Sequence, residues 1–198
     1  MRNQPELPEG YGRIFRLNTK IGETRRNVIA ISAVLCGLMV LIQLVTGDLI
    51  YTKAVFSLIL PWKILWVLAL LACSGAYLWL HLHLHGFLMR MVSGEAPVYG
   101  KNGFYFYVGS ETYFDRLSYM VIILAPVTVS YVILLLLIQA LPIELAAIAF
   151  ILQVLNIGFS GRDLLIAWRI IRTYDEILVK DNGIMLTVFG ENESAFPV

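Results

Sequence analysis

The chain has 198 residues, of which 59% are hydrophobic and only 15% are charged, and its mean hydropathy is +0.75. A soluble domain carries about 25% charged and roughly 45–50% apolar residues, and a chain this short has too small a core to bury the excess. The composition therefore excludes an ordinary soluble enzyme, a secreted disulfide scaffold and a disordered chain, and it predicts an integral membrane protein. The net charge of +1 supplies no basic surface for phosphate, which excludes a nucleic-acid partner.

Four stretches are long enough to cross a bilayer, which requires about 20 predominantly apolar residues each. They cover residues 27–47, 62–91, 117–141 and 144–171 and follow a polar segment, residues 1–26, whose fold the pattern does not specify. A hairpin around an Asn-Gly turn is predicted at about residues 97–108, and the tail, residues 173–198, repeats this pattern around Asn182-Gly183. The predicted fold is an all-α polytopic membrane protein with four transmembrane helices and two small cytoplasmic β-hairpins.

The distribution of positive charge predicts the orientation of these spans. Lysine and arginine concentrate in the first 26 residues, in the connection between the second and third spans, and in the tail. The opposite loops carry only Lys53 and Lys63. Both termini of this multi-pass protein are therefore expected to face the cytoplasm.

All three histidines of the chain occur within five residues near the end of the second span, at His81, His83 and His85. As a strand, this segment would present the three imidazoles on one face. Its depth in the membrane favours a helix, because an open strand leaves its backbone polar groups unsatisfied in lipid. A helix places His81 and His85 on one face, at the i, i+4 spacing of metal-binding helices, and His83 on nearly the opposite face. The plainer interpretation is that such histidines hydrogen-bond to headgroups or to the next loop.

Asp163 is expected at the same membrane depth as this histidine pair. His81 follows the outer end of its span, near Trp62, by 19 positions, and Asp163 follows Glu144 by the same number. At 1.5 Å per residue both helices travel roughly 28 Å, close to the thickness of the hydrocarbon core. Two imidazole nitrogens and a carboxylate oxygen suit tetrahedral zinc with one open position, so His81, His85 and Asp163 are the predicted metal ligands. Alternatively, Asp163 lies among the headgroups and only ends its span.

Two places predict irregular helices within the spans. Residues 156–161, Asn-Ile-Gly-Phe-Ser-Gly, have poor helix propensity and predict a kink or an unwound turn. Pro126, within Leu-Ala-Pro-Val, has no N–H to donate and predicts a second kink, although a proline in a span is often a packing residue only.

Taken together, these segments resemble one family, DUF3267, whose members are small four-span membrane proteins described as zincin-type peptidases and similar in layout to site-2 intramembrane metalloproteases. The resemblance runs from about the second span to near Phe189 and rests on the ordered segments 81–86, 124–126, 156 with 160–164, and 175–183. In the family the histidine segment reads His-Glu-x-x-His-Gly, its histidines bind zinc, and an aspartate of a later span is the third ligand. The resemblance implies these roles for His81, His85 and Asp163.

The chain departs from the family pattern at Leu82, which stands where the family has the glutamate. That glutamate takes a proton from zinc-bound water and protonates the leaving amine, and a leucine can do neither. No catalytic residue is therefore predicted. Arg162 is a second departure, at a position where a small residue is expected, and a cation there would weaken metal binding. Asn156 is a secondary candidate for orienting a substrate backbone or a ligand.

Three functions are compatible with these residues. In the favoured one, the zincin-like scaffold persists, zinc is its cofactor, peptide hydrolysis is lost or impaired, and the protein holds a membrane-protein or peptide partner. In the second, an active membrane zinc metalloprotease uses another base. In the third, the chain is a metal-free accessory subunit of a membrane complex. The aromatic strand near residues 104–108 either adds to an extended partner segment or caps the spans.

Overall fold

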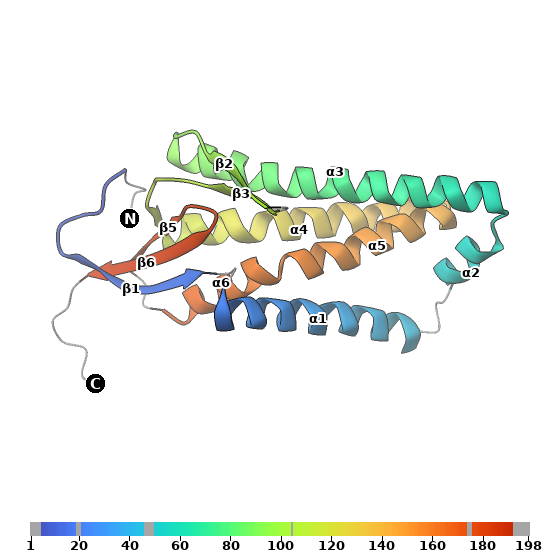
Figure 1. The fold of residues 1–198 in the computed structure, drawn as a ribbon, viewed down its shortest axis with the longest axis horizontal. Helices are drawn as coiled ribbons and strands as arrows, with labels where there is room; N and C mark the ends of the chain where they lie inside the picture. The colour runs from blue at the N-terminus through green and yellow to red at the C-terminus, as the bar shows by residue number, and fades with distance from the viewer. Residues whose placement is uncertain (1–4, 19–20, 46–49, 104, 174–175, 192–198) are drawn as a thin grey trace. The chain divides into compact units, whose positions relative to one another are not determined.

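The structure is a computed structural model that describes residues 5–18, 21–45, 50–103, 105–173 and 176–191. Groups of helices and groups of strands follow one another along the described chain (Figure 1). In order, they are β1 (Tyr11–Asn18), α1 (Gly22–Val45), α2 (Ile50–Ser57), α3 (Leu60–Ser93), β2 (Val98–Asn102), β3 (Tyr105–Gly109), β4 (Phe114–Asp115), α4 (Arg116–Ala140), α5 (Ile143–Phe159), α6 (Gly161–Ile171), β5 (Ile177–Asp181) and β6 (Met185–Glu191).

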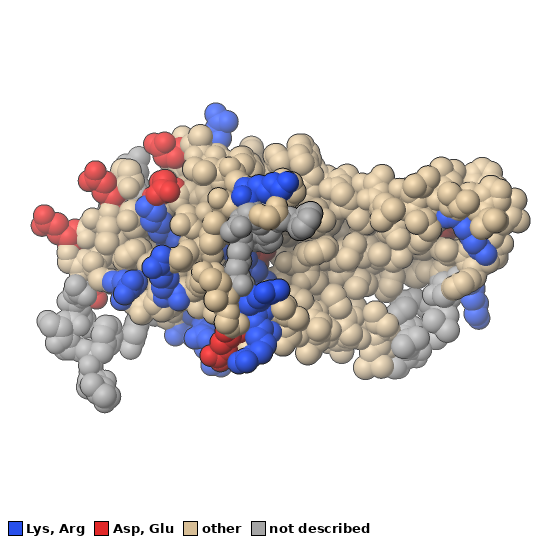
Figure 2. All heavy atoms as spheres, in the orientation of Figure 1, with Lys and Arg blue, Asp and Glu red and all other residues tan. Residues whose placement is uncertain are grey.

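Three of the described helices, α1, α3 and α4, are long and apolar enough to cross a membrane. Helices α5 and α6 add a fourth candidate if the two, which are bent by 45° at a short break, form one span. The sequence of α3 between Lys63 and Arg90 carries no lysine, arginine, aspartate or glutamate. In Figure 2 the helical part of the chain accordingly presents a surface with few charged side chains. These features are consistent with a membrane protein.

The break between α5 and α6 lies at Ser160, inside the stretch whose composition predicts a kink. The Ser160 hydroxyl donates to the carbonyl of Asn156 at 2.5 Å, and its backbone N–H donates to the same carbonyl at 3.2 Å. Ser160 thus satisfies the Asn156 carbonyl in the last turn of α5 with its own hydroxyl and N–H. Helix α6 then begins at Gly161 in a new direction. Helix α4, in contrast, continues through Pro126.

The chain divides into two compact units, of which the first consists of residues 1–28, 82–125 and 162–198. Its four-stranded antiparallel sheet has the order β1-β6-β5-β4, and a separate hairpin pairs β2 with β3. Strands β1 and β6 lie side by side along their whole length, from Tyr11 opposite Glu191 to Asn18 opposite Met185 (Figure 1). The sheet, α4 and α6 share a core whose fully buried side chains include Phe114, Tyr119, Ile122, Ile166, Ile170, Leu186 and Val188.

The prediction of an all-α fold is wrong, because β-structure is a substantial part of this unit. The tail hairpin, β5–β6, does not stand alone, since β1 extends it on one side and the short β4 on the other. Residues 11–18 belong to the segment for which the pattern specified no fold, and their pairing partner lies about 170 positions later in the chain. Local periodicity does not identify so distant a strand partner, so the four-stranded sheet escaped prediction although its β5–β6 hairpin was predicted.

The second unit consists of residues 29–81 and 126–161, and its regular structure in the described range is helical. Its core is formed by Tyr77, Leu134, Ile148, Ala149 and Leu152. Between its helices the Trp66 indole N–H donates to the carbonyl of Glu144 at 2.7 Å. One of the divisions between the units falls between His81 and Leu82, within the uninterrupted helix α3.

Candidate metal centre

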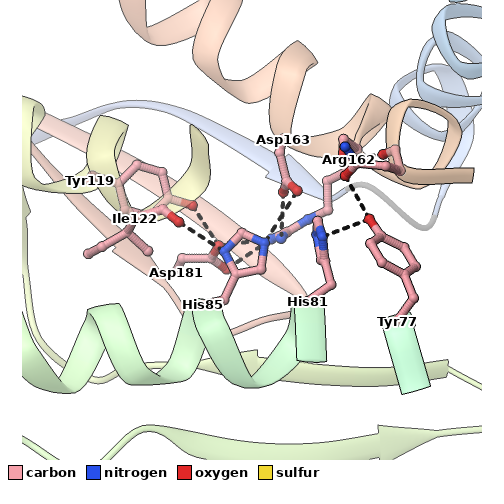
Figure 3. A network of polar contacts seen from close by, with 10 residues as sticks. Tyr77, His81, His85, Tyr119, Ile122, Arg162, Asp163 and Asp181 are labelled. Carbon is pink, nitrogen blue, oxygen red and sulfur yellow. Dashed lines mark hydrogen bonds and ion pairs between the residues drawn. The ribbon is translucent and has the colours of Figure 1, made fainter. Parts of the chain in front are cut away.

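Helix α3 presents two of the three histidines on one face. The segment is helical, as predicted, so His81 and His85 are one turn apart, and Figure 3 shows both rings pointing toward Asp163. His83 points elsewhere and stacks on Tyr99 of β2, with ring centroids 5.1 Å apart. His81 and His85 therefore form a convergent pair, and His83 packs against the hairpin.

Asp163 lies in the first turn of α6, directly after the break at Ser160. Its carboxylate is buried, with 4% of the residue exposed, and its Oδ2 lies 3.4 Å from Nε2 of His85. The helix N-terminus stabilises a negative charge in this position. Burial of a carboxylate nevertheless costs free energy unless a cation or several donors compensate for it.

The three predicted ligands are close enough to bind a metal. One ligand atom from each of His81, His85 and Asp163 lies within 4.8 Å of the other two. The ligand atoms of a tetrahedral zinc, each about 2.0–2.2 Å from the metal, lie about 3.4 Å apart, so small side-chain adjustments bring the three atoms onto one ion. Two nitrogens and one oxygen are also a donor set that zinc accepts while keeping a fourth position open. The residues present therefore fit the metal that the spacing predicts.

The charge of Arg162, expected to oppose a metal, is compensated by Asp181. The Arg162 guanidinium donates from one nitrogen to both carboxylate oxygens of Asp181, at 3.0 and 2.9 Å (Figure 3). Its other terminal nitrogen is 3.8 Å from Asp163, so the cation also lies beside the candidate ligand. Because Asp181 is only 1% exposed, solvent screens its interaction with Arg162 little. The expectation that Arg162 weakens metal binding did not take the charge of Asp181 into account.

Asp181 is a residue of this site that the sequence pattern did not predict. It directly precedes the predicted Asn182-Gly183 turn, and its Oδ1 accepts the backbone N–H of Gly183 at 2.8 Å, as turn aspartates do. The same carboxylate also accepts the Tyr119 hydroxyl at 2.6 Å. Its place in the segment 175–183, which carries part of the family resemblance, was the signal that could have identified it.

The position of the missing glutamate is occupied by a packing residue. Leu82 is partly buried and packs against the core of the first unit, as does Leu84. Of the two carboxylates drawn in Figure 3, Asp163 faces His85 and Asp181 is held by Arg162, Tyr119 and Gly183. Neither is placed as the glutamate of a His-Glu-x-x-His helix would be, directly beside the first histidine.

Asn156, the candidate for orienting a substrate or a ligand, is fully buried in the second unit. Its amide nitrogen donates to the carbonyl of Val127 at 3.1 Å, and its amide oxygen accepts the Tyr77 hydroxyl at 2.7 Å. That hydroxyl is also 3.0 Å from Nδ1 of His81. Asn156 is therefore connected to His81 of α3 through the Tyr77 hydroxyl. The position of Tyr77, four residues before His81, would have revealed it as a neighbour on the same helical face.

Comparison with known proteins agrees with this geometry. The sequence model of the DUF3267 family, described as "Putative zincin peptidase", matches residues 75–178, which is more than half of the chain. The matched stretch contains all three residues of the histidine–aspartate cluster. No curated protein and no solved structure matches the chain.

Proposed function

We propose that this chain, which belongs to the DUF3267 family, is a membrane-embedded zinc-binding protein on a zincin-peptidase scaffold, with peptide hydrolysis lost or severely reduced. The observation that carries the proposal is the convergence of His81, His85 and Asp163 in a buried cluster. A buried carboxylate 3.4 Å from an imidazole nitrogen is the arrangement that a bound cation stabilises. Zinc is the expected cation because of the donor set and the family.

The loss of hydrolysis is inferred from the group at position 82. Zinc bound in such a site supplies a Lewis acid and lowers the pKa of a bound water. Peptide cleavage additionally needs a group that takes the proton of that water and returns one to the leaving nitrogen. Leu82 supports the proposal because it has no titratable atom and packs, partly buried, against the hydrophobic core of the first unit. Asp181 is a poor substitute, since Arg162, Tyr119 and Gly183 already use its lone pairs.

The same proposal places the protein in a bilayer as a four-pass protein with both termini in the cytoplasm. The bent pair α5–α6 would be the fourth pass, and the bias of arginine and lysine supports the orientation. With hydrolysis absent, the scaffold would hold a membrane protein or an extended peptide rather than cut it. The retained zinc would then fix the structure of the site, as structural zinc does in other proteins.

Zinc analysis of the purified chain tests the metal part of the proposal. We expect about one zinc per chain in the wild type and strong loss of zinc in His85→Ala and Asp163→Asn. His83→Ala is the matched control, since this histidine stacks on Tyr99 and lies outside the cluster. A wild-type chain that remains free of zinc after incubation with excess zinc would favour the metal-free accessory subunit.

Restoring the glutamate tests the enzymatic part. Leu82→Glu puts the missing carboxylate back beside His81, and hydrolysis of fluorescein-labelled casein in detergent micelles is then compared with that of the wild type. Appearance of zinc-dependent cleavage only in Leu82→Glu is the expected result, because only the base is missing. Equal cleavage by the wild type would contradict the proposal and favour an active protease with another base. Phe87→Glu is the control for adding a carboxylate to the same helix away from the cluster, because this side chain is 60% exposed and lies on nearly the opposite face of α3.

A further inference from the structure

We infer that Pro126 and Tyr77 are positioning residues that set the tautomers of His85 and His81, so that both rings present Nε2 to the metal before it binds. Two separate hydrogen bonds carry this inference, one in each unit of the chain. It deepens the proposed function and rests on it for the role of the metal. The tautomers themselves are properties of the metal-free protein and can be measured without it.

His85 is oriented by a backbone carbonyl that a proline leaves available. Nδ1 of His85 lies 3.0 Å from the carbonyl oxygen of Ile122 in α4. In an α-helix this carbonyl would accept the N–H of the residue four positions later, which is Pro126 and has no N–H. A carbonyl only accepts, so the proton of the His85 ring must reside on Nδ1. Pro126 is thus the reason that an acceptor is present inside α4 at this point.

His81 is oriented by a chain of hydrogen bonds that runs from Asn156 through Tyr77. The contact at Asn156 fixes which atoms in this chain donate and which accept. The Asn156 amide nitrogen donates to the carbonyl of Val127, so the amide oxygen is the atom that faces Tyr77. That oxygen only accepts, and the Tyr77 hydroxyl therefore donates its single proton to it. The hydroxyl oxygen is left as an acceptor for the His81 ring, 3.0 Å away, which places the ring proton on Nδ1.

In their neutral forms both imidazoles consequently carry on Nε2 the electron pair that can bind a metal. For His85 this nitrogen faces Oδ2 of Asp163 at 3.4 Å, so that two acceptors oppose each other in a buried place. A cation or a shared proton relieves that opposition. In metalloproteins the partner of the second ring nitrogen fixes the tautomer, and its removal costs roughly 10–100-fold in metal affinity. Pro126 of the Leu-Ala-Pro segment and the buried Asn156 therefore have the same role, which is to fix the tautomer of one histidine each.

The tautomers are tested first in metal-free protein by long-range proton–nitrogen NMR on chain labelled with ¹⁵N-histidine. A chain with three histidines gives three sets of ring signals, and His83 serves as the internal reference. At about pH 8.5 we expect His81 and His85 in the Nδ1–H form. Tyr77→Phe should convert His81 to a mixture and leave His85 unchanged, whereas Pro126→Ala should do the reverse.

Matched controls separate these effects from general damage to the helices. Tyr131→Phe removes a hydroxyl from a ring of α4 that is 42% exposed, and Pro61→Ala changes a proline in the first turn of α3. Neither control should change the ring signals of His81 or His85. If Pro126→Ala does not fold, the wild-type spectrum alone decides, because an Nε2–H tautomer at either ring overturns the inference.

Zinc affinity, measured by competition with a chelator, is the second readout. Tyr77→Phe and Pro126→Ala should each weaken zinc binding about 10-fold to 100-fold, and the two control variants less than about 3-fold. Wild-type chain with the expected tautomers but no zinc binding would refute the proposed function and leave the hydrogen-bond inference intact. Zinc binding that is unaffected by both variants would refute the inference and leave the proposed function intact.

Discussion

Removing the charge of Asp181 tests whether burial, and not distance, determines how much the Arg162–Asp181 pair contributes to the free energy of unfolding. The guanidinium nitrogen and the carboxylate oxygen are 2.9 Å apart, and the two side chains are 17% and 2% exposed. At an effective dielectric constant of about 20, unit charges at that separation attract each other by about 6 kcal/mol. Loss of one partner of a buried pair costs about 3–5 kcal/mol, because the other charge is left without compensation. We therefore expect Asp181→Asn to lower the free energy of unfolding by that amount.

The preceding residue on β5 supplies the matched control. Lys180 pairs with Glu111 at 2.7 Å, a shorter distance, but the Glu111 side chain is 75% exposed and solvent screens the pair. Exposed pairs contribute about 0–1 kcal/mol, so Glu111→Gln should change the free energy of unfolding by less than about 1 kcal/mol. Both variants remove one carboxylate charge and keep the side-chain shape. Distance alone would rank the two pairs in the opposite order.

Guanidinium titration in detergent micelles, followed by tryptophan fluorescence, gives the two free energies. Adding Arg162→Met to Asp181→Asn should recover part of the loss, because the guanidinium is then no longer buried without its main partner, while Asp163 loses a cation 3.8 Å away. A loss in Asp181→Asn within 1 kcal/mol of that in Glu111→Gln would refute the reasoning, and so would a double variant less stable than the single one.

Three further predictions concern neighbouring features. Tyr119→Phe removes a hydrogen bond of 2.6 Å to the buried Asp181 carboxylate and should cost about 1.5–3 kcal/mol in the same titration, and a cost below 0.5 kcal/mol would contradict the assigned bond. Gly109→Ala should destabilise the chain by about 1–3 kcal/mol, because the added Cβ would meet the backbone of Asn182, whereas Gly75→Ala in α3 meets nothing within 4 Å and should be neutral or stabilising. Zinc at 100 times its dissociation constant should stabilise the wild type by about 2.7 kcal/mol, and equal stabilisation of His85→Ala would place the ion elsewhere.

Much of the helical framework could be predicted from local sequence, because its causes are local. Charge-free apolar runs are sufficient to form long helices, and the predicted stretches 62–91 and 117–141 lie within α3 and α4, apart from one residue beyond the end of α4. The pairing of His81 with His85 follows from the helical period alone. The poor helix formers around Ser160 likewise locate the break that gives α6 its own direction. Each of these features depends on residues only a few positions apart.

The sheet and the surroundings of Asp163 depended on residues far apart in the chain. β1 is a strand because β6 lies beside it, and Arg162 is compatible with a metal because Asp181, 19 positions later on another element, neutralises it. Neither relation has a periodic signal, since strand pairing and buried ion pairs are selected by packing among elements. Sequence by itself determined which side chains could serve a metal. Only the tertiary structure decided how their charges are balanced, because that balance is set by burial and by distances across elements.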